Sequence, residues 1–165
     1  MAKKRNPLVS IVLGSNSDLP VMKEAAAVLD DFDVPYEIFL TSAHRTPERT
    51  RTFAQAAADR GIQVIVAGAG AAAHLAGVIA SYTTLPVIGV PVNAPPLNGL
   101  DALLSTVQMP GGVPVATMAI GKAGAKNGAL MALRILAIDT TILRDKLKDY
   151  GLRMAQGIEE KQEEL

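Results

Sequence analysis

Short apolar runs that alternate with helical patterns along most of the chain constrain its fold more than any other feature. The runs are rich in Val, Ile and Leu and carry few charges, as expected of strands that are buried on both faces of a parallel sheet. They lie at residues 8–13, 34–40, 62–67, 86–90 and 115–120. This repeat predicts an α/β fold, a doubly wound parallel sheet with helices on both of its faces.

The segments between these runs carry helix signals. Ser17 or Asp18 is a suitable cap for a helix that runs to about residue 30, and Thr46 followed by Pro47 is a suitable start for the next. Further helices are expected at residues 68–81, 100–107 and 125–137, and a last one after Asp139. Because no linker, repeat or low-complexity tract interrupts this order, residues 1–165 are expected to form a single domain.

Composition excludes several classes of partner and chemistry. The 16 basic and 16 acidic residues cancel, so the chain has no basic field that would attract nucleic acid or an anionic membrane. Apolar residues make up 49% of the chain, which favours a homo-oligomer that buries part of this surface. The absence of Cys excludes disulfides and thiolate metal sites. The apolar run at 8–13 is too short for a signal peptide or a membrane span, so a cytoplasmic location is expected.

Two polar loops follow the first two strands, and both are expected at the same edge of the sheet. In the first, Ser15 and Ser17 offer hydroxyl and backbone N–H donors to a phosphate, and Asp18 suits the hydroxyls of a ribose. Capping of the following helix explains Ser17 and Asp18 equally well. In the second loop, His44 can exchange a proton near neutral pH and Arg45 can grip a phosphate with two parallel hydrogen bonds.

A small-residue turn follows the third strand at residues 68–73. It fits the glycine fingerprint of dinucleotide-binding folds, but no acidic residue lies about 20 positions further on, so NAD binding is disfavoured. A turn that approaches a carboxylate or carbon dioxide is the better interpretation. His74, just after it, is interpreted first as a partly buried structural histidine and second as a ligand contact. Lys122 and the loop at 108–110 could each serve a site or simply the surface and packing.

Seven short motifs carry a family resemblance across residues 9–137. They are Gly-Ser-Asn-Ser-Asp at 14–18, Ser-Ala-His-Arg-Thr-Pro at 42–47, Ala-Gly-Ala-Gly at 67–70, Ala-His-Leu at 73–75, Leu-Pro-Val-Ile-Gly-Val-Pro-Val at 85–92, Val-Gln-Met-Pro at 107–110 and Ala-Ile-Gly-Lys-Ala-Gly-Ala at 119–125. Together they resemble the class I 5-(carboxyamino)imidazole ribonucleotide mutases of purine biosynthesis, also called catalytic subunits of phosphoribosylaminoimidazole carboxylase.

The resemblance implies a single catalytic domain with a flavodoxin-like, three-layer αβα fold and a C-terminal helix, assembled as a homo-octamer. It implies an isomerase that needs no metal or organic cofactor and moves a carboxylate from the exocyclic nitrogen to a ring carbon of its ribonucleotide substrate. His44 would be the general acid and base. The other residues carried over would bind substrate, with Ser15 and Arg45 near the phosphate and the turn after the third strand at the migrating carboxylate. These residues are Ser15, Ser17, Asp18, Ser42, Ala43, Arg45, Ala69, Gly70, Ala72, His74 and Leu75.

Two alternatives stay open at this point. One is an aminoimidazole ribonucleotide carboxylase that uses free carbon dioxide, and the other is a non-catalytic flavodoxin-like module that binds a nucleotide. Only 4% of the residues are aromatic, which disfavours a flavin, and Ala67 and Gly68 end the third strand where a receiver domain needs Asp. The chain departs from the common family pattern at Ala71, Ala76 and residues 93–96, none of which is a proposed catalytic group.

Overall fold

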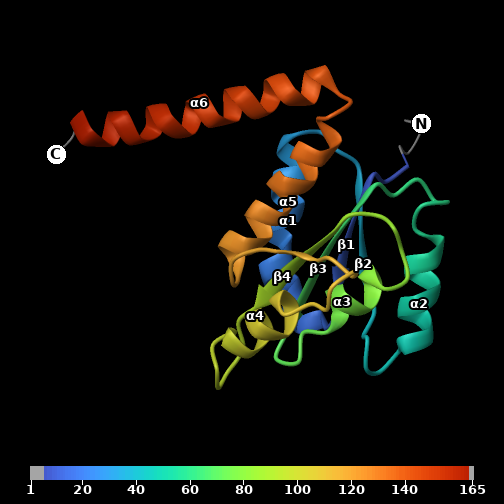
Figure 1. Cartoon of the computed structure of the whole chain (residues 1–165). Helices are drawn as coiled ribbons and strands as arrows, with labels where there is room; N and C mark the ends of the chain where they lie inside the picture. The colour runs from blue at the N-terminus through green and yellow to red at the C-terminus, as the bar shows by residue number, and fades with distance from the viewer. Residues whose placement is uncertain (1–5, 164–165) are drawn as a thin grey trace. The chain divides into compact units, whose positions relative to one another are not determined.

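The computed structural model describes residues 6–163, and its contacts divide the chain into two compact units, Met1–Ala132 and Leu133–Leu165. The first unit holds a five-stranded parallel sheet of order β2-β1-β3-β4-β5 (Figure 1). Its strands are β1 (Val9–Leu13), β2 (Tyr36–Leu40), β3 (Val64–Gly70), β4 (Val87–Val92) and β5 (Ala116–Thr117). This order is that of flavodoxin-like folds, and the predicted fold class is therefore confirmed.

Helices separate the strands and cover both faces of the sheet. In the first unit they are the short 3₁₀ helix η1 (Asn16–Asp18) and the α-helices α1 (Leu19–Asp31), α2 (Pro47–Ala56), α3 (Leu75–Ala80) and α4 (Leu100–Val107), together with most of α5 (Lys122–Leu136). Helix α6 (Thr141–Glu163) belongs to the second unit. The predicted helix at residues 100–107 is confirmed at both ends. Helix α6 runs through Gly151 without a break. Among the described residues, no helix is both long and apolar enough to cross a membrane.

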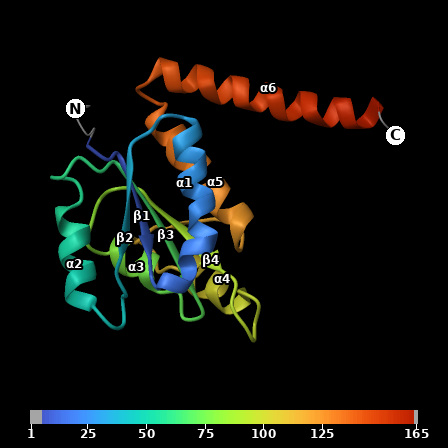
Figure 2. The ribbon, with the colours of Figure 1, turned by 180° about the vertical axis from the view of Figure 1, so that it is seen from behind.

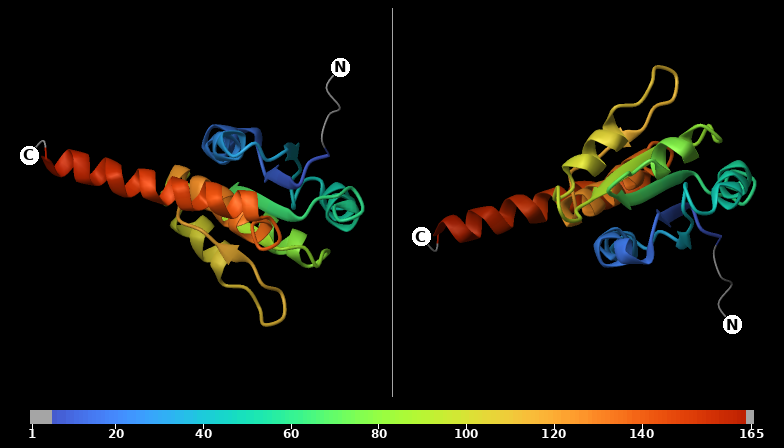
Figure 3. Two further views of the ribbon diagram at one scale, coloured as in Figure 1. Left: turned by 90° about the horizontal axis from the view of Figure 1, so that it is seen from above. Right: turned by 90° about the horizontal axis from the view of Figure 1, so that it is seen from below.

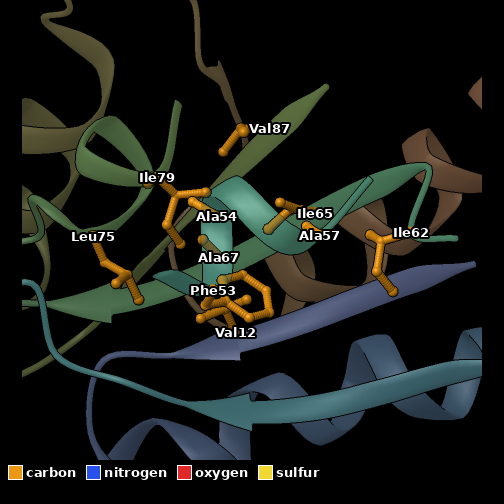
Figure 4. Packing of buried hydrophobic residues seen from close by; sticks show 11 residues of the cluster. Val12, Phe53, Ala54, Ala57, Ile62, Ile65, Ala67, Leu75, Ile79 and Val87 are labelled. Atoms are coloured by element: carbon orange, nitrogen blue, oxygen red, sulfur yellow. The ribbon is translucent and has the colours of Figure 1, made fainter. Parts of the chain in front are cut away.

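Alternation of side chains along β3 assigns the helices to two faces. Ala67 points to a core that Phe53 of α2 and Ile79 of α3 complete (Figure 4). Gly68 points the opposite way, where Met22 of α1 lies directly over it. The sheet therefore lies between α1 and the pair α2 and α3, and the views along it show α1 and α4 on opposite sides (Figure 3).

Helices α1 and α5 lie next to each other on one face (Figure 2). The carboxylate of Glu24 in α1 pairs with Lys122 at 3.3 Å and with Lys126 at 3.4 Å in the first turns of α5. Gly128 lets α5 approach the sheet, because an added Cβ there would lie only 3.2 Å from the Val66 side chain. The close approach at Gly128 places α5 over β3 and β4, and the exposed ion pairs with Glu24 add little to it.

The turn after the third strand differs from the prediction. Gly68 to Gly70 were expected to open a helix, but they belong to β3 and pair with β4 as far as Gly70 and Val92. Helix α3 begins only at Leu75. The bend itself falls at Ala71, whose φ of 52° lies in the left-handed region that favours glycine. The strand is longer than expected because its small residues fit between apolar neighbours on both faces and keep the extended conformation as far as Gly70.

The fifth strand is shorter than its predicted range of 115–120. Regular pairing with β4 covers only Ala116 and Thr117. Beyond it, the N–H of Met118 donates to Gly89 O at 2.9 Å and that of Gly121 donates to Pro91 O at 2.8 Å. The segment therefore follows the edge of β4 with irregular spacing, which the apolar pattern of the sequence does not reveal.

Three threonine hydroxyls position the loop between β2 and α2. Thr41 and Thr50 are buried, and their Oγ1 atoms lie 2.8 Å apart. Thr46 Oγ1 lies 3.2 Å from Thr41 Oγ1 and accepts a 2.9 Å hydrogen bond from the N–H of Ser42. Thr46 does occupy the predicted N-cap position of α2, but its side chain makes no bond to the helix. The hydroxyl instead closes the loop on itself.

We expect Thr50→Val to loosen this loop, because it keeps the shape of the side chain and removes the hydroxyl that faces Thr41. The free energy of unfolding should fall by about 0.5–1.5 kcal/mol, the net contribution of one hydrogen bond, because Thr41 keeps its contact with Thr46. Amide hydrogen exchange at Ser42 and Thr46 should become faster, whereas Thr50→Ser should retain slow exchange. Thr106→Val removes another buried hydroxyl, inside α4, and serves as the matched control. Unchanged exchange at Ser42 and Thr46 in Thr50→Val would show that the hydroxyls do not hold the loop.

Candidate active site

An open cavity of about 520 Å³ lies where the chain leaves the carboxyl ends of the central strands. In a sheet of this order, the strand connections diverge to opposite faces between β1 and β3, which leaves a crevice at that edge. Every predicted site residue except His74 lines this cavity. The lining also includes three residues outside the predicted set. It consists of Gly14, Ser15, Ser17, Asp18, Ser42, Ala43, His44, Arg45, Ala69, Gly70, Ala71, Ala72, Leu75 and Ala94.

The loop after β1 is held by a reciprocal capping box. Ser15 is the N-cap of η1, and its Oγ accepts a 3.4 Å hydrogen bond from the N–H of Ser17. The Asp18 carboxylate reaches back and accepts a 2.8 Å hydrogen bond from the N–H of Ser15. Asp18 also occupies the N-cap position of α1 but makes no side-chain bond to that helix. Asp18 therefore occupies the expected N-cap position of α1, but its side chain serves the capping box of the short helix before it.

Asp18 is a buried carboxylate beside the cavity, with 5% of its surface exposed. Burial raises its pKa above the ordinary value of 3.8, because removal from water disfavours the charged form. The N–H groups of Ser15 and Gly14 and the guanidinium of Arg45 oppose this rise in pKa. One Asp18 oxygen is occupied by the capping box, which leaves acceptor capacity on the carboxylate for a ligand hydroxyl.

Arg45 connects the two polar loops. Its Nη2 donates to the carbonyl of Gly14 at 3.5 Å, and its backbone N–H donates to Ser42 Oγ at 3.2 Å. Its Nε lies 3.5 Å from the same hydroxyl. The structure thus brings the loop after β1 and the loop after β2 to one rim, as their positions at strand ends predict. The guanidinium is exposed and retains donors that can reach a bound anion.

His44 and His74 form a pair at the mouth of this site. His44 Nε2 lies 2.8 Å from His74 Nδ1, and the two rings meet edge to face with centroids 5.0 Å apart. His74 stands at the N-cap position of α3 and is exposed, so the expectation that this histidine is partly buried was wrong. His74 does not line the cavity, whereas its partner His44 does.

Small residues form the wall opposite the two loops. A Cβ added at Gly70 would lie 3.2 Å from the carbonyl oxygen of Val92, and one at Gly14 would lie 3.3 Å from the Cβ of Ala69. Both glycines therefore lie close to their neighbours, and neither position has room for a side chain without a shift of the surrounding atoms. Ala71 and Ala94, both at positions where the sequence departs from the common family pattern, complete the wall.

Two features that the sequence left open lie outside the cavity. The Lys122 ammonium pairs with Glu24, and Met109 packs against Gly77 of α3. The loop at 108–110 is therefore packed onto α3. Within residues 6–163, no group of three or more His, Asp or Glu side chains is arranged to hold a metal ion.

Comparison with known proteins shows the family directly. The model of the AIR carboxylase family matches residues 8–157. An N5-carboxyaminoimidazole ribonucleotide mutase of Pyrococcus horikoshii is 60% identical over 163 residues, which are 99% of this chain and 91% of that protein. Another, of Bacillus subtilis, is 54% identical over 159 residues, which are 96% of this chain and 98% of that protein.

Solved structures agree with this assignment. The crystal structure of Treponema denticola PurE superposes with a TM-score of 0.86 at 30% sequence identity and covers 96% of this chain and 98% of that one. Sequence and fold thus point to the same group, as the motif resemblance predicted. The chain belongs to the AIR carboxylase family.

Proposed function

We propose that this chain is an N5-carboxyaminoimidazole ribonucleotide mutase of purine biosynthesis. It moves the carboxylate of its substrate from the exocyclic nitrogen to a ring carbon and yields 5-amino-1-(5-phosphoribosyl)imidazole-4-carboxylate. The observation that carries the proposal is the juxtaposition, on one cavity rim, of His44, Arg45 and the capped Ser15–Asp18 loop. Relatives that are 52–60% identical to this chain and are named N5-carboxyaminoimidazole ribonucleotide mutases support the same reaction.

The cavity suits a ribonucleotide of this shape. The hydroxyl of Ser15 and the guanidinium of Arg45 would bind the phosphate, and the free acceptor capacity of Asp18 would bind ribose hydroxyls. Ser17, Ser42 and Ala43 would line the sugar and the base, and Leu75 would contact the imidazole. Ala69, Gly70 and Ala72 would hold the carboxylate and then the carbon dioxide released from it. Their small apolar side chains would keep the gas next to the imidazole ring and exclude water.

The reaction needs one proton, which leaves His44 in the first step and returns to it in the last. As the bond between the carboxyl carbon and the exocyclic nitrogen breaks, His44 donates a proton to that nitrogen and carbon dioxide is released. The electron-rich ring carbon then attacks carbon dioxide, and a carbon–carbon bond forms. The ring carbon of this intermediate carries a surplus proton, which His44 removes to restore aromaticity. Atoms and charge balance over the cycle.

Assays with the two possible substrates test this proposal against the carboxylase alternative. We expect turnover of N5-carboxyaminoimidazole ribonucleotide in buffer from which carbon dioxide has been removed. Turnover only of aminoimidazole ribonucleotide with added carbon dioxide would instead identify a carboxylase. No turnover of either, together with tight binding of the nucleotide, would identify a binding module.

The proposal also covers the oligomeric state of the chain and its location in the cell. Residues 1–165 act as a single catalytic domain in a cytoplasmic homo-octamer. The exposed apolar side chains of Leu97, Leu100, Leu104 and Val107 support an oligomer, because they line one side of α4 and the loop before it. A sedimentation mass equal to one chain would contradict the octamer.

We expect His44→Asn to bind the ribonucleotide and to lose turnover. The amide keeps a polar group of similar size at the rim but cannot exchange a proton, so kcat should fall by about 10²- to 10⁴-fold. Affinity for aminoimidazole ribonucleotide, measured by calorimetry, should change little. Thr50→Ser, which keeps the loop intact, provides the matched control. A kcat equal to that of the wild type would remove His44 from the chemistry.

We expect Asp18→Asn to weaken substrate binding without weakening the fold. Because burial raises the pKa of Asp18, its charged form destabilises the folded chain at pH 7, and this destabilisation disappears as the pH falls through that pKa to below 3.8. Urea unfolding should therefore show Asp18→Asn at least as stable as the wild type at pH 7, with a smaller advantage in acid. KM should rise, because a charged acceptor for the ribose is lost. Asp59→Asn, at an exposed site, should change neither quantity.

A further inference from the structure

The pairing of His44 with His74 assigns different tasks to the two nitrogens of the proposed catalytic ring. An imidazole nitrogen offers either one hydrogen or one lone pair, so the contact with His74 Nδ1 at 2.8 Å occupies Nε2 of His44. Within the described residues, Nδ1 of His44 makes no hydrogen bond. Because His44 lines the cavity and His74 does not, Nδ1 is the nitrogen left for a molecule bound there.

We propose that His74 is a positioning residue for His44. It holds Nε2 of His44, fixes the orientation of that ring across the cavity mouth, and leaves Nδ1 as the atom that moves the proton. The proposal rests on the proposed mutase function and adds to it the identity of the reacting nitrogen. The tautomer of a histidine is set by the bond that its other nitrogen makes, and this contact supplies such a bond.

The pair can stay intact through the whole proton cycle. In the acid form the pair carries one positive charge, with hydrogens on Nδ1 of His44, on Nε2 of His74 and between the two rings. When Nδ1 of His44 donates its proton to the departing nitrogen, the shared hydrogen remains on Nε2 of His44. His44 is then neutral with a lone pair on Nδ1, ready to remove the proton from the ring carbon. His74 keeps its Nε2 hydrogen in both forms.

The backbone supports this arrangement from two strands. His44 lies in the loop that the hydroxyls of Thr41, Thr46 and Thr50 close, and His74 lies just beyond the bend that ends β3. Strands β2 and β3 flank β1 in the sheet, so the two loops are brought together by strand order and not by proximity along the chain. Both side chains are exposed, so replacing His74 should leave the core unchanged.

Two substitutions separate positioning from other roles. His74→Asn places an amide oxygen near the position of Nδ1 and keeps an acceptor for Nε2 of His44. His74→Leu fills a similar volume and offers none. We expect His74→Leu to lose about 10- to 100-fold in kcat with KM changed less than about 2-fold, and His74→Asn to recover most of that loss.

Three outcomes would overturn the proposal. A wild-type kcat in His74→Leu would show that His44 needs no support. A rise in KM with unchanged kcat would make His74 a substrate ligand, as the family resemblance first implied. Equal losses of kcat in His74→Leu and His74→Asn would show that an acceptor for Nε2 is not what His74 provides.

A spectroscopic readout tests the pair without any turnover. The chain has two histidines, so an untagged His74 variant labelled with ¹⁵N at its imidazole reports on His44 alone. We expect the His74→Asn variant to show His44 with its hydrogen on Nε2, and the His74→Leu variant to show a mixture of tautomers. Identical spectra for the two variants would refute the pairing. If the wild type lacks mutase turnover, the proposed function fails, and these spectra still decide whether His74 sets the tautomer.

Discussion

The parallel pairing of β1 with both β2 and β3 is the constraint on which the site depends. Leu13 is in register with Leu40 on one side and with Gly68 on the other, so β1 and β2 end at the same level and β3 continues beside the loop after β1 for two more residues. The N–H of Gly14 then donates to Gly68 O, and that of Thr41 donates to Leu13 O, each at 3.0 Å. These bonds continue the strand pairing into the first residues of the loops. They thereby place a carboxylate, a guanidinium and an imidazole around one cavity.

The site combines stabilising and destabilising features. The capping box and the threonine hydroxyls satisfy the polar groups of both loops and hold them without bound ligand. Asp18, by contrast, is buried close to an open cavity, and its raised pKa shows that the folded chain carries its charge at some expense of stability. The strain at Ala71, whose φ is 52°, falls in the same place. Such local costs are expected at functional sites, where the surrounding structure maintains them.

Sequence patterns predicted the features that depend on local order. Buried strands such as β1 are continuous apolar runs, and α4 has a clear helical period, so both were found with little or no error in their ends. The extension of β3 to Gly70 was missed, because small residues suit a strand and a turn equally and only the pairing with β4 decides.

The detail of the site depended on contacts that no local pattern carries. The polar loops themselves were recognisable from strand ends and residue types. Ser15, rather than Ser17, caps the first loop because the backbone bends into a 3₁₀ turn before α1. The contact between His44 and His74 joins residues 30 positions apart and exists only because of the order of the strands. No spacing rule could have found it.

The absence of a side chain at Gly68 on β3 makes room for the side chain of Met22 on α1. A Cβ at position 68 would overlap the Met22 thioether, which lies over the strand with no exposed surface of its own. A larger residue at 68 would therefore push α1 outward, and the serine-rich loop that precedes α1 would move with it. Gly68 and Met22 are therefore matched in size, so that a larger side chain on the strand calls for a smaller or displaced one on the helix.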